Sequence, residues 1–284
     1  MLSYGFGAGG SYSLTRRLSW RASESLSSSL AQDSEILTTG GTVLPGVVAR
    51  TNVASTSLGY LVSPKVQLEA SVSETSVLFP GSEYQDGSSV AVQTRVSRQV
   101  GKNQSVGVSF GTAFSSGTTG DIQGLLATWQ RTFGRDLTLS ATGGVRPYVL
   151  YGVSGYQFAP GGSFALGKRW VRGQSFTIAY ERAVEQAFGF NRTHLAHRIN
   201  AGYAFALGRQ MALDGTANYG LNTYPQIAGF QMGGRTATAG VRYLLRSQLS
   251  LGATVGVWNK FETGAPATTI YRAGVSLSYG GAWR

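Results

Sequence analysis

The segment Ile199–Leu221 alternates between apolar and small or polar residues, and this alternation restricts the possible folds more than any other feature. One parity of its first half carries Ile199, Ala201, Tyr203, Phe205 and Leu207, and the residues between them are Asn, Gly and Ala. A period of two is the period of a β-strand with one apolar and one polar face. Gly208–Gln210 interrupts the pattern, which resumes at Met211, so the segment predicts two strands joined by a tight turn.

The same unit recurs along the chain, because short turns that contain a basic residue separate further alternating runs. Gly, Pro, Asn and Ser in these turns suit the backbone conformations that turns require. The seven predicted tight turns are Thr15–Arg17, Ser63–Lys65, Gly101–Asn103, Gly134–Asp136, Arg172–Gln174, Gly208–Gln210 and Arg246–Gln248. Longer connections rich in Gly, Ser, Thr and Pro are predicted near 31–45, 79–88, 115–120, 151–161, 189–193, 222–232 and 262–267.

Hairpins that follow one another in this way predict an antiparallel meander, which must close on itself to leave no exposed edge. Only 13% of the residues are charged and 40 are Gly, whereas soluble domains carry about 25% charged residues and about 7% Gly. The sequence contains no run of about 18 apolar residues, which is the length that a membrane-spanning helix needs. We therefore predict one all-β domain over residues 1–284, a closed antiparallel up-and-down transmembrane β-barrel.

About fifteen strands are visible, the first over roughly 2–14 and the last over roughly 268–280, and both run away from the longer loops. Bacterial single-chain barrels have even strand numbers. Either a sixteenth strand completes the intact protein, which we favour, or the end strands pair in parallel. Because Met1–Gly7 lacks the features of an export signal, we expect the numbered chain to be a mature form, an expression fragment or the C-terminal part of a longer protein.

Parity also predicts which side chains face lipid and which face the lumen. The predicted lipid face carries Val90, Val92, Val96, Val106, Val108, Phe110, Leu137, Leu139, Phe176, Ile178, Tyr180, Val241, Tyr243, Leu249, Leu251, Val255, Val257, Tyr271, Val275, Leu277 and Tyr279. Glu24 and Lys168 fall on the same parity, which a bulge or a strand end near the headgroups would explain.

The predicted lumen face carries an arginine group and fewer acids. Its candidate site residues are Arg21, Arg95, Arg146, Arg198, Arg242 and Arg272, with Glu69, Glu181 and Asp214 opposing them. Arginines that share one lumen favour anions, and each guanidinium can bind a carboxylate or phosphate with two hydrogen bonds. The alternative is a network of neutralising ion pairs that stiffens the wall. Although the net charge is +11, the basic residues form no continuous helix or arm, so nucleic acid is not a predicted partner.

The sequence predicts no enzyme, cofactor or metal site. The only two histidines, His194 and His197, stand three residues apart in a predicted strand and therefore point to opposite faces. We interpret both as surface-loop or interface residues, although Glu185 on the preceding strand could approach His194. The Gly-rich stretches lack the following helix and the GK[ST] signature of a phosphate-binding loop.

The Ser- and Gly-rich strands and arginine-containing turns, as in Gly240–Thr254 and Tyr271–Tyr279, resemble bacterial outer-membrane β-barrels and, more narrowly, the porin-like barrels encoded with exopolysaccharide-export systems. The resemblance implies the outer membrane as location, and outer-membrane lipids, the barrel-assembly machinery and a periplasmic or secretion-system protein as partners. Such barrels usually end in an aromatic residue that the assembly machinery recognises. Here Val275, Leu277 and Tyr279 fit the alternating part of this signal, and Trp283 is penultimate.

A barrel of this size encloses an aqueous channel unless something fills it. We therefore predict a pore or conduit that passes anionic solutes or secreted polysaccharide through an arginine-lined lumen, with the 31–45 connection as the best candidate for a partial constriction. The alternative is a structural or assembly barrel whose lumen is plugged by a partner or an upstream segment.

Overall fold

The computed structural model describes residues 4–30, 48–81, 84–116, 121–149, 155–170, 173–187, 192–208, 210–225, 227–246 and 249–279. Within these ranges the chain forms fifteen β-strands, and no helix there is long and apolar enough to span a membrane. The strands are β1 Tyr4–Ser13, β2 Leu18–Leu30, β3 Val48–Ser63, β4 Val66–Leu78, β5 Gly87–Gly101, β6 Gln104–Ser116, β7 Ile122–Phe133, β8 Leu137–Val149, β9 Tyr156–Arg169, β10 Ser175–Ala187, β11 Arg192–Leu207, β12 Met211–Thr223, β13 Gln231–Arg246, β14 Leu249–Glu262 and β15 Ala265–Tyr279.

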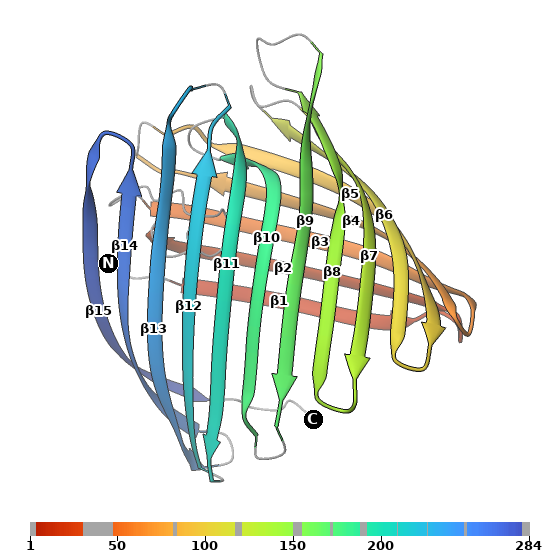
Figure 1. Ribbon diagram of the computed structural model, residues 1–284. Helices are drawn as coiled ribbons and strands as arrows, with labels where there is room; N and C mark the ends of the chain where they lie inside the picture. Colours follow the sequence, from red (N-terminus) through yellow and green to blue (C-terminus); the bar gives the residue numbers. More distant parts are fainter. Residues whose placement is uncertain are drawn as a thin grey trace.

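The strands form one sheet in which sequence order and spatial order are the same, and every neighbouring pair is antiparallel (Figure 1). The predicted meander of about fifteen strands is therefore confirmed. Four of the seven predicted tight turns, Thr15–Arg17, Ser63–Lys65, Gly101–Asn103 and Gly134–Asp136, connect consecutive strands at one end of the sheet, and the other three include residues outside the described ranges. The predicted longer connection over 262–267 is wrong, because only Thr263 and Gly264 separate β14 from β15, and Gly264 has the positive φ of 83° that such a tight turn favours.

The predicted closure of the barrel is not present among the described residues. The sheet curls so that β1–β6 lie behind the later strands in Figure 1, but β1 and β15 form no ladder with each other. The physical reason lies in the strand number. With fifteen strands in antiparallel order the first and last run in the same direction, so direct closure would need a parallel pair. The completing sixteenth strand remains a prediction.

The predicted lipid face is the outer face of the sheet. Between 37% and 59% of the surface is exposed for four representative residues of this face, Val92, Phe110, Ile178 and Val255. In the register, each of them stands opposite a residue of the neighbouring strand that points to the same face. Side chains this apolar and this exposed form the band that faces hydrocarbon in a membrane barrel.

Two charged residues that parity assigns to this band have different explanations. Lys168 is the penultimate residue of β9, so the predicted strand-end position is confirmed. Glu24 lies in the middle of β2, where neither ladder shows a register shift. The bulge proposed for it is therefore wrong, and its carboxylate instead accepts a hydrogen bond from the Asn52 side-chain amide at 3.3 Å.

One hairpin leaves the wall of the sheet. The β9–β10 ladder stops at Arg182, although β10 continues to Ala187, and Figure 1 shows β10 curving away from β9 at its upper end. Val184 then packs with Ile122, Tyr148 and Ala159 in one buried cluster. These three come from β7, β8 and β9 and share the parity of the lumen face. The strand ends next to the β10–β11 connection, residues 183–187 of β10 and 193–196 of β11, therefore fold inward across the lumen side of β7–β9, and these residues are called the hairpin tip below.

Candidate functional site: the charged lumen wall

All nine predicted site residues lie on the face opposite the exposed apolar band, as their parity requires. Two acid–arginine pairs are direct cross-strand neighbours in the register, Glu69 with Arg95 and Glu181 with Arg198. The structure does not, however, bring the arginines into one shared group. It separates them into a partly buried charged group near the β10–β11 tip, in which Arg198 is ion-paired, and individual side chains elsewhere on the wall.

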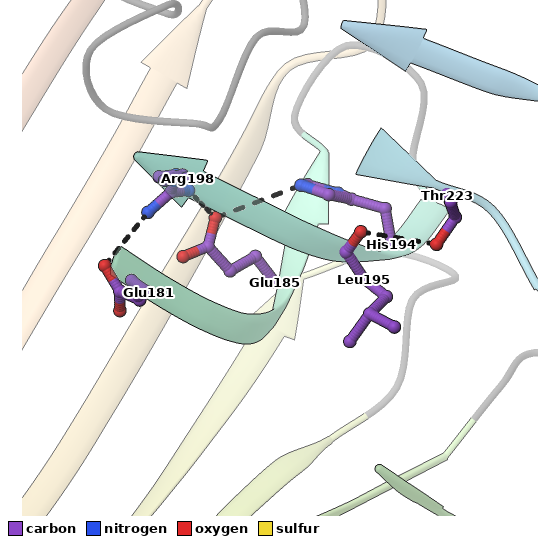
Figure 2. A network of polar contacts seen from close by, with 6 residues as sticks. All are labelled: Glu181, Glu185, His194, Leu195, Arg198 and Thr223. Atoms are coloured by element: carbon purple, nitrogen blue, oxygen red, sulfur yellow. Dashed lines mark hydrogen bonds and ion pairs between the residues drawn. The ribbon is translucent and has the colours of Figure 1, made fainter. Parts of the chain in front are cut away.

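The buried group, here called the charge cluster, consists of Arg146, Glu181, Glu185, His194 and Arg198. Figure 2 shows Arg198 between the two carboxylates of β10. Its guanidinium forms an ion pair with Glu185 and lies 3.7 Å, Nη1 to Oε2, from Glu181. Because only 11% of the Arg198 side chain is exposed, these carboxylates compensate a charge that is largely removed from water.

Arg146 on β8 extends the charge cluster along the wall. It is attracted by Glu181 and repelled by Arg198. Its side chain lies across Gly161 of β9, where an added Cβ would come within 2.8 Å of Nε and 3.0 Å of Cγ. The absence of a side chain at position 161 therefore lets Arg146 lie flat on the lumen wall.

The interpretation of the histidines as surface or interface residues is wrong for His194, although not for His197. The His194 side chain is fully buried, Nε2 lies 3.9 Å from Glu185 Oε2, and its ring centroid is 5.6 Å from that of Tyr224. His197 faces the outside, as the predicted opposite orientation requires, and pairs with the Tyr180 hydroxyl at 3.0 Å. The burial of His194 follows from the inward fold of the hairpin tip, which a local residue pattern does not report.

Three predicted lumen arginines stand apart from any such cluster. Arg21 on β2 and Arg242 on β13 are exposed, and Arg95 on β5 is half-buried. Within the described part of the chain, their guanidinium groups make no ion pair and no hydrogen bond. We refer to these three as the unpaired arginines.

The remaining predicted residues contact the wall itself. Asp214 lies against Gly240, with its Oδ2 3.0 Å from the position that a Cβ would take. Arg272 on β15 lies over the Trp258 ring, 5.2 Å from its centroid, a distance at which a cation is attracted to an aromatic face.

Sequence reasoning missed two charged lumen residues. Glu185 was considered only as a neighbour of His194, although it shares the parity of Glu181 and stands opposite His194 in the register. Lys260 shares the parity of Trp258 and lies 3.5 Å from Glu262. Parity alone would have found both, and because one is an acid and the other a base, they leave the excess of positive charge of the predicted set unchanged.

The ion pairs of the charge cluster connect β10 and β11 and so stabilise this hairpin. A substrate could reach the His194 ring only if the folded hairpin tip moved, and Glu185 is engaged by Arg198. No three His, Asp or Glu side chains in the described ranges lie close enough to hold a metal ion.

No protein-family model matches the sequence, and the comparison with curated proteins finds no match. Among solved structures, OccAB2 of Acinetobacter baumannii aligns with 98% of this chain and 91% of its own at 11% identity and a TM-score of 0.46. The ferric-catecholate import receptor Fiu of E. coli K12 aligns with 98% of this chain and 67% of its own at 11% identity and a TM-score of 0.44. OmpT, an outer membrane protein of Vibrio cholerae, aligns with 96% of this chain and 99% of its own at 13% identity and a TM-score of 0.38.

Similarities this distant carry no information about solute or mechanism, and the fold is established by the sheet of the chain itself. Its strands follow one another in up-and-down order, its outer face carries an exposed apolar band, and its inner face carries charged residues of several strands, among them Arg95, Glu181 and Arg198. The chain forms a curled, fifteen-stranded antiparallel sheet with the strand order and the two faces that outer-membrane β-barrels have.

Proposed function

We propose that the chain forms an outer-membrane pore that favours anionic solutes. The observation that carries the proposal is the set of unpaired arginines, because Arg21, Arg95 and Arg242 lie on three separate strands and face the lumen without forming an ion pair in the described structure. A low-dielectric wall focuses the field of such charges and raises the local concentration of anions. The apolar outer band supports a membrane location, with outer-membrane lipids as its surroundings.

Passage of solutes requires a closed wall, and closure is part of the proposal. Unpaired backbone N–H and C=O groups at a strand edge cost several kcal/mol each in hydrocarbon. We propose that a sixteenth strand lies between β1 and β15, antiparallel to both. Neighbouring strands are about 4.8 Å apart, so strands that flank a third are separated by about 10 Å.

Closure can be tested by cross-linking, because the chain contains no cysteine. Each variant carries two cysteines, one at Gly10 of β1 and one at a position along β15. The two should form no disulfide in the membrane-inserted protein, since a disulfide needs Cα atoms about 4.4–6.8 Å apart. They should be joined by a bismaleimide reagent that spans the width of an intervening strand. Efficient disulfide formation along the two strands would show direct parallel closure instead.

Selectivity is tested by reversal potentials in planar bilayers. A salt gradient should produce an anion-selective potential that weakens as ionic strength rises, because screening shortens the range of the arginine field. Changing Arg21 and Arg242 together to Glu should move the reversal potential toward cation selectivity. An unchanged potential would contradict the proposal, and an absence of conductance would favour the structural or assembly barrel with a filled lumen.

The finer proposal, that the anionic solute is a secreted polysaccharide delivered by a periplasmic or secretion-system protein, has a separate test. An acidic polysaccharide added to one side of the bilayer should interrupt the current in a voltage-dependent manner as the chain threads the pore. A neutral polymer of the same length is the control. Equal effects of both polymers would contradict export of an acidic chain.

A further inference from the structure

A hollow lies on the lumen face at the tight-turn end of β3–β7, away from the charge cluster. Its volume is about 460 Å³, which lies within the range of ligand pockets in proteins. The strands supply alternate residues to it, among them Gln67 and Glu69 of β4, Arg95 of β5 and Gln130 of β7. We call it the turn-end hollow.

The cations of the turn-end hollow outnumber its acids. Lys65, Arg95 and Lys102 line it together with one acid, Glu69, whereas Arg98, which also borders it, shares the outward parity of its register partner Val106. Cationic side chains gathered at one concave surface attract anions and orient them before contact. The hollow therefore selects first for negative charge.

Arg95 is the residue in this hollow whose hydrogen bonding is least complete. Its Nε atom is buried and has no hydrogen-bond partner in the described structure. Glu69 is its cross-strand neighbour in the register, but the two side chains form no ion pair within 4 Å among the described contacts. The guanidinium of Arg95 therefore has donors that no described protein group engages, and a carboxylate bound in the hollow would accept from its terminal nitrogens.

Uncharged polar groups surround these cations. They are the side chains of Gln67, Ser97, Gln99, Asn103, Gln104, Ser105, Gln130 and Thr132. Amides and hydroxyls both donate and accept hydrogen bonds, so they match the hydroxyl groups of a sugar better than they match a bare inorganic anion. The combination of guanidinium, ammonium and amide groups is complementary to a molecule with one negative charge and several hydroxyls.

The turns that frame the hollow are held together by main-chain hydrogen bonds. The Gln99 amide donates to the Lys65 carbonyl at 2.8 Å, and the Thr132 amide donates to the Asn103 carbonyl at 2.8 Å. These bonds connect three successive hairpins at their turn ends. The hollow is therefore formed before a ligand arrives, which reduces the entropy lost on binding.

We propose that the turn-end hollow binds a sugar acid, a polyhydroxylated molecule with one carboxylate, through Arg95. The inference rests on the proposed anion-selective pore and adds a saturable site to its wall. The carboxylate accepts from the Arg95 guanidinium, and the hydroxyls exchange hydrogen bonds with the surrounding amides.

Calorimetric titration of the detergent-solubilised protein with gluconate, acetate and glucose separates the two parts of this recognition. Gluconate should bind at one site and more tightly than either acetate, which lacks the hydroxyls, or glucose, which lacks the charge. If acetate binds as tightly as gluconate, or if gluconate does not saturate, the proposal is wrong.

The matched variants are Arg95→Gln in the hollow and Arg235→Gln on the outward parity of β13, where the arginine is exposed and does not face the lumen. Loss of a charge-assisted hydrogen bond of about 1.5–3 kcal/mol should weaken gluconate binding by at least about tenfold in R95Q, whereas R235Q should bind as the parent does. Equal weakening in both variants would show a diffuse electrostatic effect and overturn the site. Anion-selective conductance without saturable gluconate binding would leave the pore intact and refute only the hollow.

Discussion

The lumen wall of β8–β11 and that of β2–β5 carry the same type of residue at the same parity, yet they differ in what the arginines do. On β8–β11, Arg146 and Arg198 lie in a buried cluster with two carboxylates under a folded hairpin tip. On β2–β5, Arg21 and Arg95 face the lumen without an ion-pair partner among the described residues. The parity of a residue decides its face, but the path of the neighbouring strand ends decides whether its charge is neutralised.

This difference predicts which arginines contribute to the free energy of unfolding and which contribute to the ion selectivity of the pore. In the buried region a guanidinium costs desolvation energy that its carboxylates must offset. In the open region Arg21 is exposed to water, so its removal changes the potential of the lumen more than the stability of the fold. Four substitutions test this division, and they follow in order of their expected effect on the free energy of unfolding.

The largest effect is expected for Glu185→Ala. It removes one carboxylate from the largely buried Arg198, and Glu181 at 3.7 Å compensates only in part. We expect a loss of about 3 kcal/mol in the free energy of unfolding, near the lower end for breaking a buried ion pair. Denaturant unfolding of the protein refolded in lipid vesicles measures this, with Arg21→Gln as the control for the open wall. A loss equal to that of R21Q would remove the distinction between the two regions.

A smaller effect is expected for Val184→Ala, which shortens the side chain that holds the hairpin tip inward. Val184 is 3% exposed, whereas Val92, on the lipid-facing parity of β5, is 39% exposed. We expect V184A to lose about 1–2 kcal/mol as buried methyl groups are removed, and V92A to lose less because lipid refills the space. The same unfolding assay compares them. Equal losses would mean that the tip does not pack against β7–β9.

Gly161→Ala tests whether the Arg146 side chain lies against the backbone of β9 at Gly161. The new Cβ would come within 2.8 Å of the Arg146 Nε, while Gly143, on the neighbouring strand, has no atom within 4 Å of its Cβ position. Crowding of this kind costs about 1 kcal/mol or more, so G161A should be destabilised and G143A should not. If G161A is as stable as the parent, Arg146 does not lie on Gly161.

The smallest effect on stability is expected for Arg242→Glu. Arg242 is exposed on the lumen face of β13, so its replacement should change the free energy of unfolding by less than about 0.5 kcal/mol. The same substitution should move the reversal potential toward cations. A variant that unfolds much more easily would place Arg242 in an unrecognised structural network, and a variant with unchanged potential would remove it from the lumen.

The face of each strand residue was predictable because it depends on a period of two that the backbone imposes locally. Val255 and Ile178 lie outward and Arg95 and Asp214 inward, as their parities require. The four tight turns within the described ranges were predictable for the same reason, since Gly, Pro and Asn report local backbone geometry. Two predicted features, the constriction at 31–45 and the terminal residue Trp283, lie outside the described residues.

The sequence by itself therefore determined the number of visible strands, their order and the two faces of the sheet. Only the tertiary structure decided that the β10–β11 tip leaves the wall, because this depends on Val184 meeting Ile122 and Tyr148, which are distant along the chain. In the same region His194 is buried with its ring near Tyr224, and Glu185 forms an ion pair with Arg198. Local periodicity records which way a side chain points, whereas burial and charge pairing depend on contacts between strands that no local pattern contains.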